Sequence, residues 1–309
     1  MDRGVRRAYT LRDPMDRAAS NDAELLAAAR AGDRAALVRL LERHEDAIYR
    51  FALRMCRDRE DARDIVQETL LAAVRGLGEF RGEAALSTWL FAVARSFCGK
   101  KRRLRKGEPH RLSALDEAPE VDALVDAGHA PDEVLVRREL ERAIAAAIDA
   151  LDPRAREVLL LRDVEGLAAA EVAAVVGVGI PAVKSRLHRA RLAVRERIAP
   201  LLEARPAHGT PAPPAPVRAA TAVVPNRGSE AACPDVLALL SRHLEGQVRP
   251  SVCRELEGHV EQCSRCRAAC DSLRRTLALC KTHVRDDEVP PAVRRAVHRA
   301  LLDDLASIS

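Results

Sequence analysis

The chain has 309 residues, which is enough for two or three small domains, and only 2% of them are aromatic. Its 51 basic and 46 acidic residues leave a net charge of +5, so only local basic clusters can indicate nucleic-acid binding. No apolar run reaches the ~18 to 20 residues of a membrane span, and no signal peptide is evident, so a cytoplasmic protein is expected. The composition predicts an all-α fold of small helical bundles rather than sheets or barrels.

The first part of the chain is predicted to be a disordered leader over 1–20 followed by a helical domain over 21–107. Within that domain Gly32 ends one apolar stripe, Asp33 caps the next helix, and a third helix covers 59–77. The polar side chains of the third helix lie near its N-terminus, where acidic groups are stabilised by the helix dipole, and this alone can explain them. They are Asp61, Asp64, Gln67 and Glu68.

A loop, an aromatic residue and a basic helix follow. Residues 80–87 are loop-like, Ser87 or Thr88 can cap a helix, and the helix predicted from Trp89 runs into 99–106, where six of eight residues are basic. Cations for the backbone and pockets for unstacked bases are what single-stranded DNA requires. A purely structural role for Trp89, the single tryptophan of the chain, is an equally good interpretation.

Residues 108–132 are rich in Pro, Gly, Asp and Ala, which predicts a flexible linker to a second helical domain over 133–204. Apolar periodicity in that domain breaks at Glu165-Gly166 and again at 177–179, which gives three helices. The last of them carries six Lys/Arg between Lys184 and Arg197, opposed only by Glu196. A solvated face normally mixes signs, so a short helix, a glycine turn and this basic helix predict a DNA-binding helix-turn-helix.

Two sets of strings resemble the extracytoplasmic-function (ECF) sigma factors of bacterial RNA polymerase. VLLLRDVEGL and VKSRLHRAR resemble the fourth sigma domain, while DARDIVQETLLAAVRGL and FRGEAALSTWLFAVARSFC resemble the second. The resemblance implies binding to core polymerase through the β′ clamp helices and the β flap, and recognition of promoter −10 and −35 elements.

The resemblance also assigns residues. It implies polymerase contacts at Asp61, Asp64, Gln67 and Glu68. It implies −10 contacts or their supports at Arg81, Ser87, Thr88, Trp89, Arg95, Lys100, Lys101, Arg102 and Arg103. It implies −35 contacts at Lys184, Ser185, Arg186, His188, Arg189 and Arg191.

The chain departs from the family just before the recognition helix. The family usually has Gly-Thr there, whereas this chain has Pro181-Ala182, so the hydroxyl cap is missing. An alanine cap costs about 1 kcal/mol, and proline in the first turn partly offsets this by presetting φ. Binding is expected to survive, with an altered −35 specificity.

A Pro/Ala-rich linker over 205–229 leads to a cysteine module over 230–309, which holds six of the eight cysteines. Thiols in a reducing compartment indicate metal or redox chemistry rather than structural disulfides. Three thiolates and one imidazole can close a tetrahedral Zn²⁺ shell, with His259 and Cys263 four apart on one helical face. The predicted ligands are Cys233, His259, Cys263 and Cys266.

The module resembles the zinc-binding anti-sigma domain with its HxxxCxxC motif, which is usually found on a separate protein. A terminal apolar stripe from Val293 to Ile308 can dock on the sigma domains or cover the module's own core. Cys253, Cys270 and Cys280 receive no role.

The main hypothesis is a non-enzymatic ECF sigma factor regulated in cis by its zinc module. A narrower hypothesis adds redox control, in which oxidation of the zinc-bound thiolates expels the metal and releases the module. The alternative is a stand-alone helix-turn-helix regulator that acts without polymerase. A zinc hydrolase is disfavoured, because four protein ligands leave no open position for water.

Overall fold

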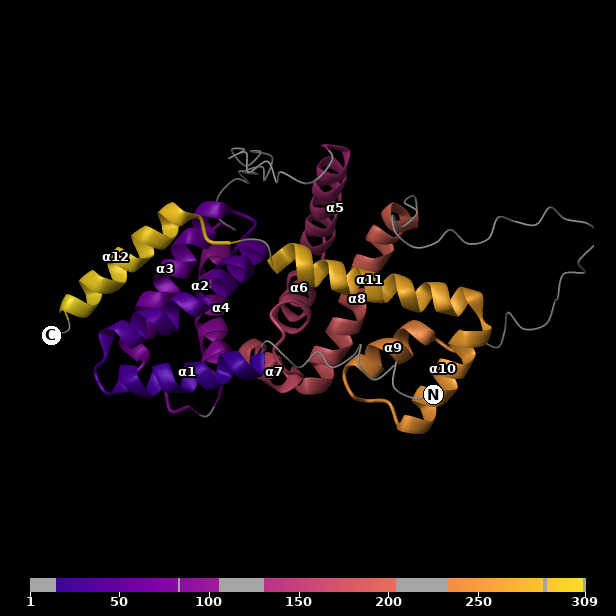
Figure 1. The fold of residues 1–309 in the computed structure, drawn as a ribbon, viewed down its shortest axis with the longest axis horizontal. Coiled ribbons are helices and arrows are strands. Elements are labelled where there is room, and N and C mark those ends of the chain that lie inside the picture. Colours follow the sequence, from indigo (N-terminus) through magenta and orange to yellow (C-terminus); the bar gives the residue numbers. More distant parts are fainter. Residues whose placement is uncertain (1–14, 83, 106–130, 204–232, 286–287, 308–309) are drawn as a thin grey trace, which may run out of the picture.

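A computed structural model describes residues 15–82, 84–105, 131–285 except 204–232, and 288–307. Every regular element in these residues is helical, which confirms the predicted all-α fold (Figure 1). None of the described helices is both long enough and apolar enough to cross a membrane. The predicted linkers lie almost wholly outside the described residues, as does most of the predicted leader.

The N-terminal unit consists of four helices, α1 (Met15–Arg30), α2 (Arg34–Cys56), α3 (Arg59–Gly76) and α4 (Leu86–Arg105). Aspartates cap two of them: Asp33 Oδ1 accepts from Ala36 N at 2.9 Å, and Asp58 Oδ1 accepts from Asp61 N at 2.9 Å. The core between these helices is formed by large apolar side chains of α2, α3 and α4, among them Phe51, Ile65 and Leu90.

Two boundaries differ from the sequence expectation. Helix α1 begins at Met15, so residues 15–20, expected in a disordered leader, are helical; no glycine or proline interrupts them. Helix α4 begins at Leu86 rather than at Trp89, so Ser87 and Thr88 lie inside its first turn and neither is its cap. Both differences extend a helix toward its N-terminus, where helix ends are hardest to fix from sequence.

The middle unit contains α5 (Pro131–Asp149), α6 (Pro153–Leu159), a π-helical turn (Leu160–Val164), α7 (Ala169–Val176) and α8 (Ile180–Glu203). Asp152 caps α6 by accepting from Arg154 N at 2.9 Å, and Pro153 occupies its first turn. Gly177 ends α7 with φ of 72°, in the left-handed region that glycine enters at no steric cost. After this turn, α8 packs against α6 and α7.

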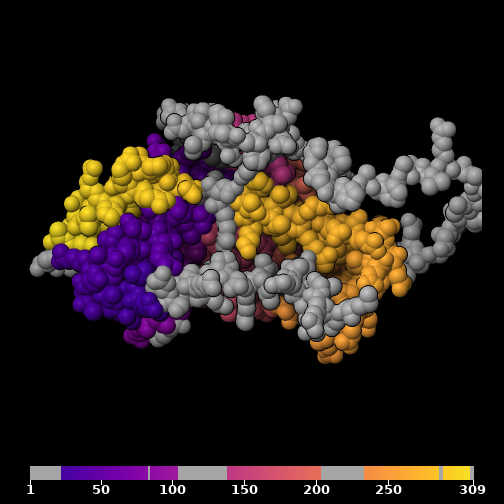
Figure 2. Space-filling view, in the orientation of Figure 1, coloured from indigo at the N-terminus to yellow at the C-terminus, as the bar shows by residue number. Residues whose placement is uncertain are grey.

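The C-terminal segment contains α9 (Val236–Leu244), α10 (Pro250–Gln262), α11 (Ser264–Arg285) and α12 (Pro291–Ser307). A small separate core joins α9, α10 and the start of α11 through Val236, Leu240, Cys270 and Leu273. The rest of α11 leaves this core and lies across the middle unit, where Cys280 is fully buried. Helix α12 continues to the N-terminal unit and packs beside α3 (Figures 1 and 2).

One continuous apolar core therefore runs from the N-terminal unit through the middle unit to α12. Its residues range from Leu37 on α2 to Leu305 on α12, with Ile148, Leu187 and Val297 between them. The terminal apolar stripe predicted from sequence lies on the N-terminal unit: Val297 is 3% exposed and Leu301 1% exposed, and both belong to this core. The C-terminal segment thus contacts both preceding units.

Candidate functional site

The helix-turn-helix is formed by α7 and α8. The residue before α7, Ala168, has no side-chain oxygen that could cap the helix. Glu171 in the first turn reaches back instead, and its Oε2 accepts from Ala168 N at 2.7 Å. Helix α8 buries Val183, Leu187 and Val194 against the middle unit. Leu192 on the same helix is only half-buried.

The six predicted −35 residues on α8 do not share one environment. Ser185 and Arg189 are exposed, while Lys184, Arg186 and His188 are partly buried. Arg191 is 2% exposed. A side chain so covered does not reach a base or a phosphate in this conformation.

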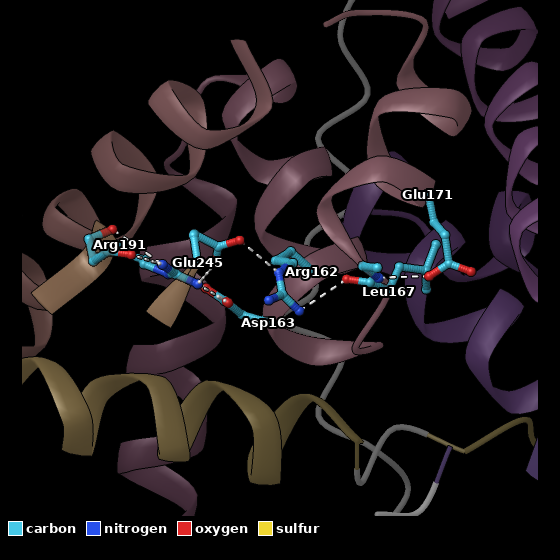
Figure 3. Close-up of polar contacts among 8 residues, drawn as sticks. Arg162, Asp163, Leu167, Glu171, Arg191 and Glu245 are labelled. Atoms are coloured by element: carbon cyan, nitrogen blue, oxygen red, sulfur yellow. Dashed lines mark hydrogen bonds and ion pairs between the residues drawn. The ribbon is translucent and has the colours of Figure 1, made fainter. Parts of the chain in front are cut away.

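Arg191 is held by acids from two other elements (Figure 3). Its Nη2 lies 2.6 Å from Asp163 Oδ1 on the π-helical turn and 2.9 Å from Glu245 Oε1 just after α9. Its Nη1 also donates to the carbonyl and hydroxyl of Ser241 at 3.3 and 3.2 Å. Burial disfavours the charged guanidinium, but the two carboxylates outweigh it and the pKa of Arg191 is raised. Arg191, implied by the resemblance as a −35 contact, is therefore buried in this conformation, because Asp163 and the C-terminal segment supply its partners.

Glu245 extends this network to a second arginine. Its Oε2 lies 3.1 Å from Arg162 Nε, and Arg162 Nη1 donates to Leu167 O at 3.1 Å (Figure 3). The Glu245 side chain is 3% exposed, and its negative charge is balanced by the two arginines rather than by solvent. Sequence reasoning missed Glu245 and Ser241, and no local pattern marks them, because their partners lie before the linker.

Two of the predicted −10 residues on α4, Thr88 and Arg95, contact the middle unit. Thr88 is 4% exposed and its Oγ1 donates to Glu171 Oε1 at 3.1 Å, while Arg95 pairs with Glu157 on α6. Burial raises the pKa of Glu157, and the adjacent Arg95 opposes this shift. Thr88 is therefore buried against the middle unit, whereas Arg95 pairs with that unit but keeps 40% of its side chain exposed.

Trp89 has a packing role. It is partly buried against the core, and its ring lies 5.3 Å from that of Phe80. A Cβ added at Gly76 would lie 3.1 Å from the Trp89 ring, so glycine allows this close approach. The structural interpretation of this tryptophan therefore accounts for its position.

The basic end of α4 is partly neutralised by α3. Lys101 Nζ lies 2.7 Å from Asp64 Oδ2 and 3.5 Å from Asp61 Oδ1, so a predicted DNA contact pairs with two predicted polymerase contacts. The remaining predicted −10 side chains lie at or near the surface: Arg81, Lys100, Arg102 and Arg103 are exposed, and Ser87 is partly buried.

The four predicted polymerase contacts on α3 are mostly accessible. Asp64, Gln67 and Glu68 are exposed, whereas Asp61 is 7% exposed. Helix α12 packs along α3 and pairs Asp304 with Arg75 at 3.2 Å, while these three side chains stay exposed. The acidic surface of α3 is therefore left open by the C-terminal segment.

The structure brings the four predicted metal ligands together. One ligand atom from each of Cys233, His259, Cys263 and Cys266 lies within 4.8 Å of the other three. Cys233 Sγ is 4.0 Å from Cys263 Sγ, and His259 Nε2 is 3.2 Å from Cys266 Sγ. Zn–S bonds of about 2.3 Å in a tetrahedron separate sulfur atoms by about 3.8 Å, so the donor set and its spacing fit a metal ion. The cluster can hold a metal with no position left for water.

Comparison with known proteins covers the first two units. The sequence model of Sigma-70 region 2 matches residues 40–107, and that of Sigma-70, region 4 matches residues 141–194. These ranges include most of α2, all of α3 and α4, and the helix-turn-helix up to residue 194 of α8, and both end before the cysteine cluster.

Among curated proteins, the RNA polymerase sigma-H factor of Pseudomonas aeruginosa is 30% identical over 187 residues, which cover 59% of this chain and 95% of that protein. The ECF RNA polymerase sigma factor SigM of Mycobacterium tuberculosis is 37% identical over 175 residues, which cover 55% and 81%. A solved chain in "Structure of CnrH in complex with the cytosolic domain of CnrY" is 28% identical and covers 60% of this chain and 98% of its own, with a TM-score of 0.43. The chain belongs to the ECF sigma factors of RNA polymerase, which are non-catalytic transcription initiation factors that bind core polymerase and promoter DNA.

Proposed function

We propose that this sigma factor is held in a closed, DNA-incompetent state by its own C-terminal segment, which a Zn²⁺ ion organises. The observation that carries the proposal is the burial of Arg191 on the recognition helix under Ser241 and Glu245. A sigma factor must present this helix to the −35 element. The closed state therefore has to open before promoter binding.

The proposed division is a sigma region 2 unit over 21–107, a sigma region 4 unit over 133–204 and a regulatory module over 230–309. In this division the N-terminal unit binds polymerase through Asp61, Asp64, Gln67 and Glu68 and opens the −10 element through α4. The exposure of three of the four α3 side chains supports the first assignment. Zinc at the Cys/His cluster fixes α10 to the start of α11, which positions α9 over α8.

Contacts between the two sigma units support the same closed state. Arg50 on α2 binds Glu165 with two bonds of 3.2 Å, and Thr88 and Arg95 engage α7 and α6. These bonds mask part of the proposed −10 surface with the proposed −35 unit. Opening must therefore separate the units as well as remove α9.

In vitro transcription with purified core polymerase tests the proposal. Glu245→Gln in the full chain removes the carboxylate by which the C-terminal segment pairs with Arg191 and Arg162, so promoter-dependent transcription is expected to rise several-fold. Glu255→Gln on the exposed face of α10 is the matched control and should change nothing. A chain of residues 1–204 should also exceed the full chain.

Two results would contradict the proposal. If full chain, Glu245→Gln and 1–204 all direct transcription equally, the C-terminal segment does not inhibit. If the full chain binds an operator equally well with and without core polymerase, the stand-alone regulator is correct, although the matches to both sigma regions do not favour it.

A further inference from the structure

A second Cys/His pair lies in the C-terminal segment, apart from the four-ligand cluster. His243 is near the end of α9, Cys253 is in the first part of α10, and His243 Nδ1 lies 3.2 Å from Cys253 Sγ. The described residues show no third metal-ligating side chain close enough to make this pair a metal site. A thiol in contact with an imidazole is instead the arrangement of an activated nucleophile, because the ring nitrogen can take the thiol proton.

The pair opens on a cavity between α9, α10 and α11. Its volume is about 170 Å³, which far exceeds the ~15 Å³ that one water needs on the same measure and admits a small organic molecule. Leu240, Leu256 and Val260 form apolar walls, and the Cys253 side chain is only partly buried. The nucleophile therefore faces a space suited to a hydrocarbon chain.

The charged groups at the cavity select against anions. Glu257 and Glu261 line it and are exposed, so a negatively charged compound is repelled. Arg274 also lines it, paired with Asp271 at 3.2 Å, and supplies a cation for oxygen that gains negative charge during a reaction. A neutral compound whose oxygen becomes anionic only as it reacts fits both features.

Oxidation of Cys253 to a disulfide with a second thiol fits the cavity less well than addition of a compound to Cys253 alone. Cys270 lines the same cavity but is 1% exposed, and burial raises the pKa of its thiol. A thiol held protonated is a poor partner for resolving an oxidised cysteine. Addition to Cys253 alone needs no second thiol and no oxidant.

We infer that Cys253 is a covalent acceptor for small neutral α,β-unsaturated carbonyl compounds. His243 takes the thiol proton, and Cys253 Sγ bonds to the β carbon of the compound. The π electrons move to the carbonyl oxygen as an enolate beside Arg274, and the proton held by His243 returns to the α carbon. The product is a thioether, no group leaves, and no oxidant or reductant is consumed.

The Cys253 site lies close in sequence to the residue proposed to hold the closed state, Glu245. His243 lies two residues before Glu245, which bonds Arg191 and Arg162. An adduct wedged between α9 and α10 displaces the end of α9, and with it Glu245. This consequence rests on the proposed cis inhibition, whereas the covalent site does not.

Labelling of the full-length, zinc-loaded protein with trans-2-hexenal at pH ~7 tests the site, read by intact mass and peptide mapping. A single early adduct on Cys253 is expected. Cys253→Ser should abolish it, and His243→Gln should slow it at least about tenfold at pH 7 but much less at pH ~9.5, where solution base replaces the imidazole. Cys56→Ser is the control, since Cys56 is likewise partly buried and should not matter.

Results that contradict the covalent site differ from results that contradict its effect on transcription. Equal labelling of Cys56 and Cys253 in the wild-type chain, or an unchanged rate in His243→Gln with normal zinc content, overturns the site. Labelling of Cys253 can also be rapid without raising transcription, although Glu245→Gln does raise it. This result supports the covalent site but excludes its effect on the proposed cis inhibition. Failure of Glu245→Gln itself bears on the proposed function alone.

Discussion

Arg191 on α8 and Glu245 after α9 form an ion pair of 2.9 Å in which neither side chain is more than 3% exposed. Their positions lie 54 residues apart, and Asp163 completes the pair from the other side at 2.6 Å. A recognition helix and the segment that covers it thus share one buried charge network, and each member of it depends on the others.

Removing Arg191 is expected to destabilise the closed molecule. Arg191→Ala leaves Asp163, whose side chain is 10% exposed, without its arginine partner, and leaves Glu245 with Arg162 alone. Breaking a buried pair costs about 3 to 5 kcal/mol. Urea unfolding followed by circular dichroism measures the change in free energy of unfolding. The matched control is Arg189→Ala on the exposed face of the same helix, which should cost less than about 0.5 kcal/mol. Similar costs for the two variants would show that the network contributes nothing.

The metal cluster predicts zinc content and a folding dependence. The purified chain is expected to hold one tightly bound zinc ion, and His259→Ala or Cys263→Ser should lose it together with helical signal from α10 and α11. Cys253→Ser in the same segment is the control and should keep the zinc. Metal analysis and circular dichroism with and without a chelator provide the measurement. A zinc-free chain with unchanged helicity would exclude the structural site.

The docking of α12 is expected to weaken as pH rises toward neutrality. Burial raises the pKa of Glu45 from 4.5 to about 7, with Arg294 opposing and Asp46, Glu42 and His298 also acting on it. A raised carboxyl pKa means that the folded state holds the proton more tightly, so this stabilisation is complete below pH 4.5 and is lost as pH rises through 7.

Glu45→Gln should remove this decline between pH 5 and 8, because an amide does not titrate. Amide hydrogen exchange of α12 reports its docking directly. His298→Gln, made in both backgrounds, separates any contribution of the histidine that contacts Glu42 at 2.9 Å. A wild-type chain whose α12 protection is constant over this range would rule out Glu45 as the titrating group.

The exposed acids of α3 predict a charge-dependent contact with polymerase. Asp64→Lys should weaken binding to core polymerase roughly tenfold, which corresponds to about 1.4 kcal/mol. Glu60→Lys in the first turn of the same helix is the matched control, because it is exposed but not among the predicted contacts. Fluorescence anisotropy of a labelled sigma factor gives both constants. Equal loss in both variants would indicate a general charge effect.

Local signals were sufficient for much of the fold. Asp33 and Asp152 cap the helices that they precede, Gly177 takes the left-handed conformation, and Val183 and Leu187 are buried as their spacing indicates. Each of these outcomes depends on neighbours within one or two turns. Helix propensity and apolar period therefore predict them from the sequence.

The environment of the candidate sites depended on distant residues. Thr88 and Arg95 lie on α4 as predicted, yet their partners Glu171 and Glu157 come from another unit. Arg191 fits the basic face of α8 until Glu245 covers it. Spacing indicates Cys233 as a fourth ligand beside the three later ones, but the docking of α9 against α11 is what brings it there.

The C-terminal segment that buries Arg191 and the recognition helix α8 belong to one polypeptide, with 29 residues between Glu203 and Cys233. Their effective concentration is set by the length of the connection between them, and linked sites can reach the millimolar range. Under the proposed regulation, repression then has the same strength in a cell with ten copies as in one with thousands, since every molecule synthesised carries its own inhibitor in a one-to-one ratio.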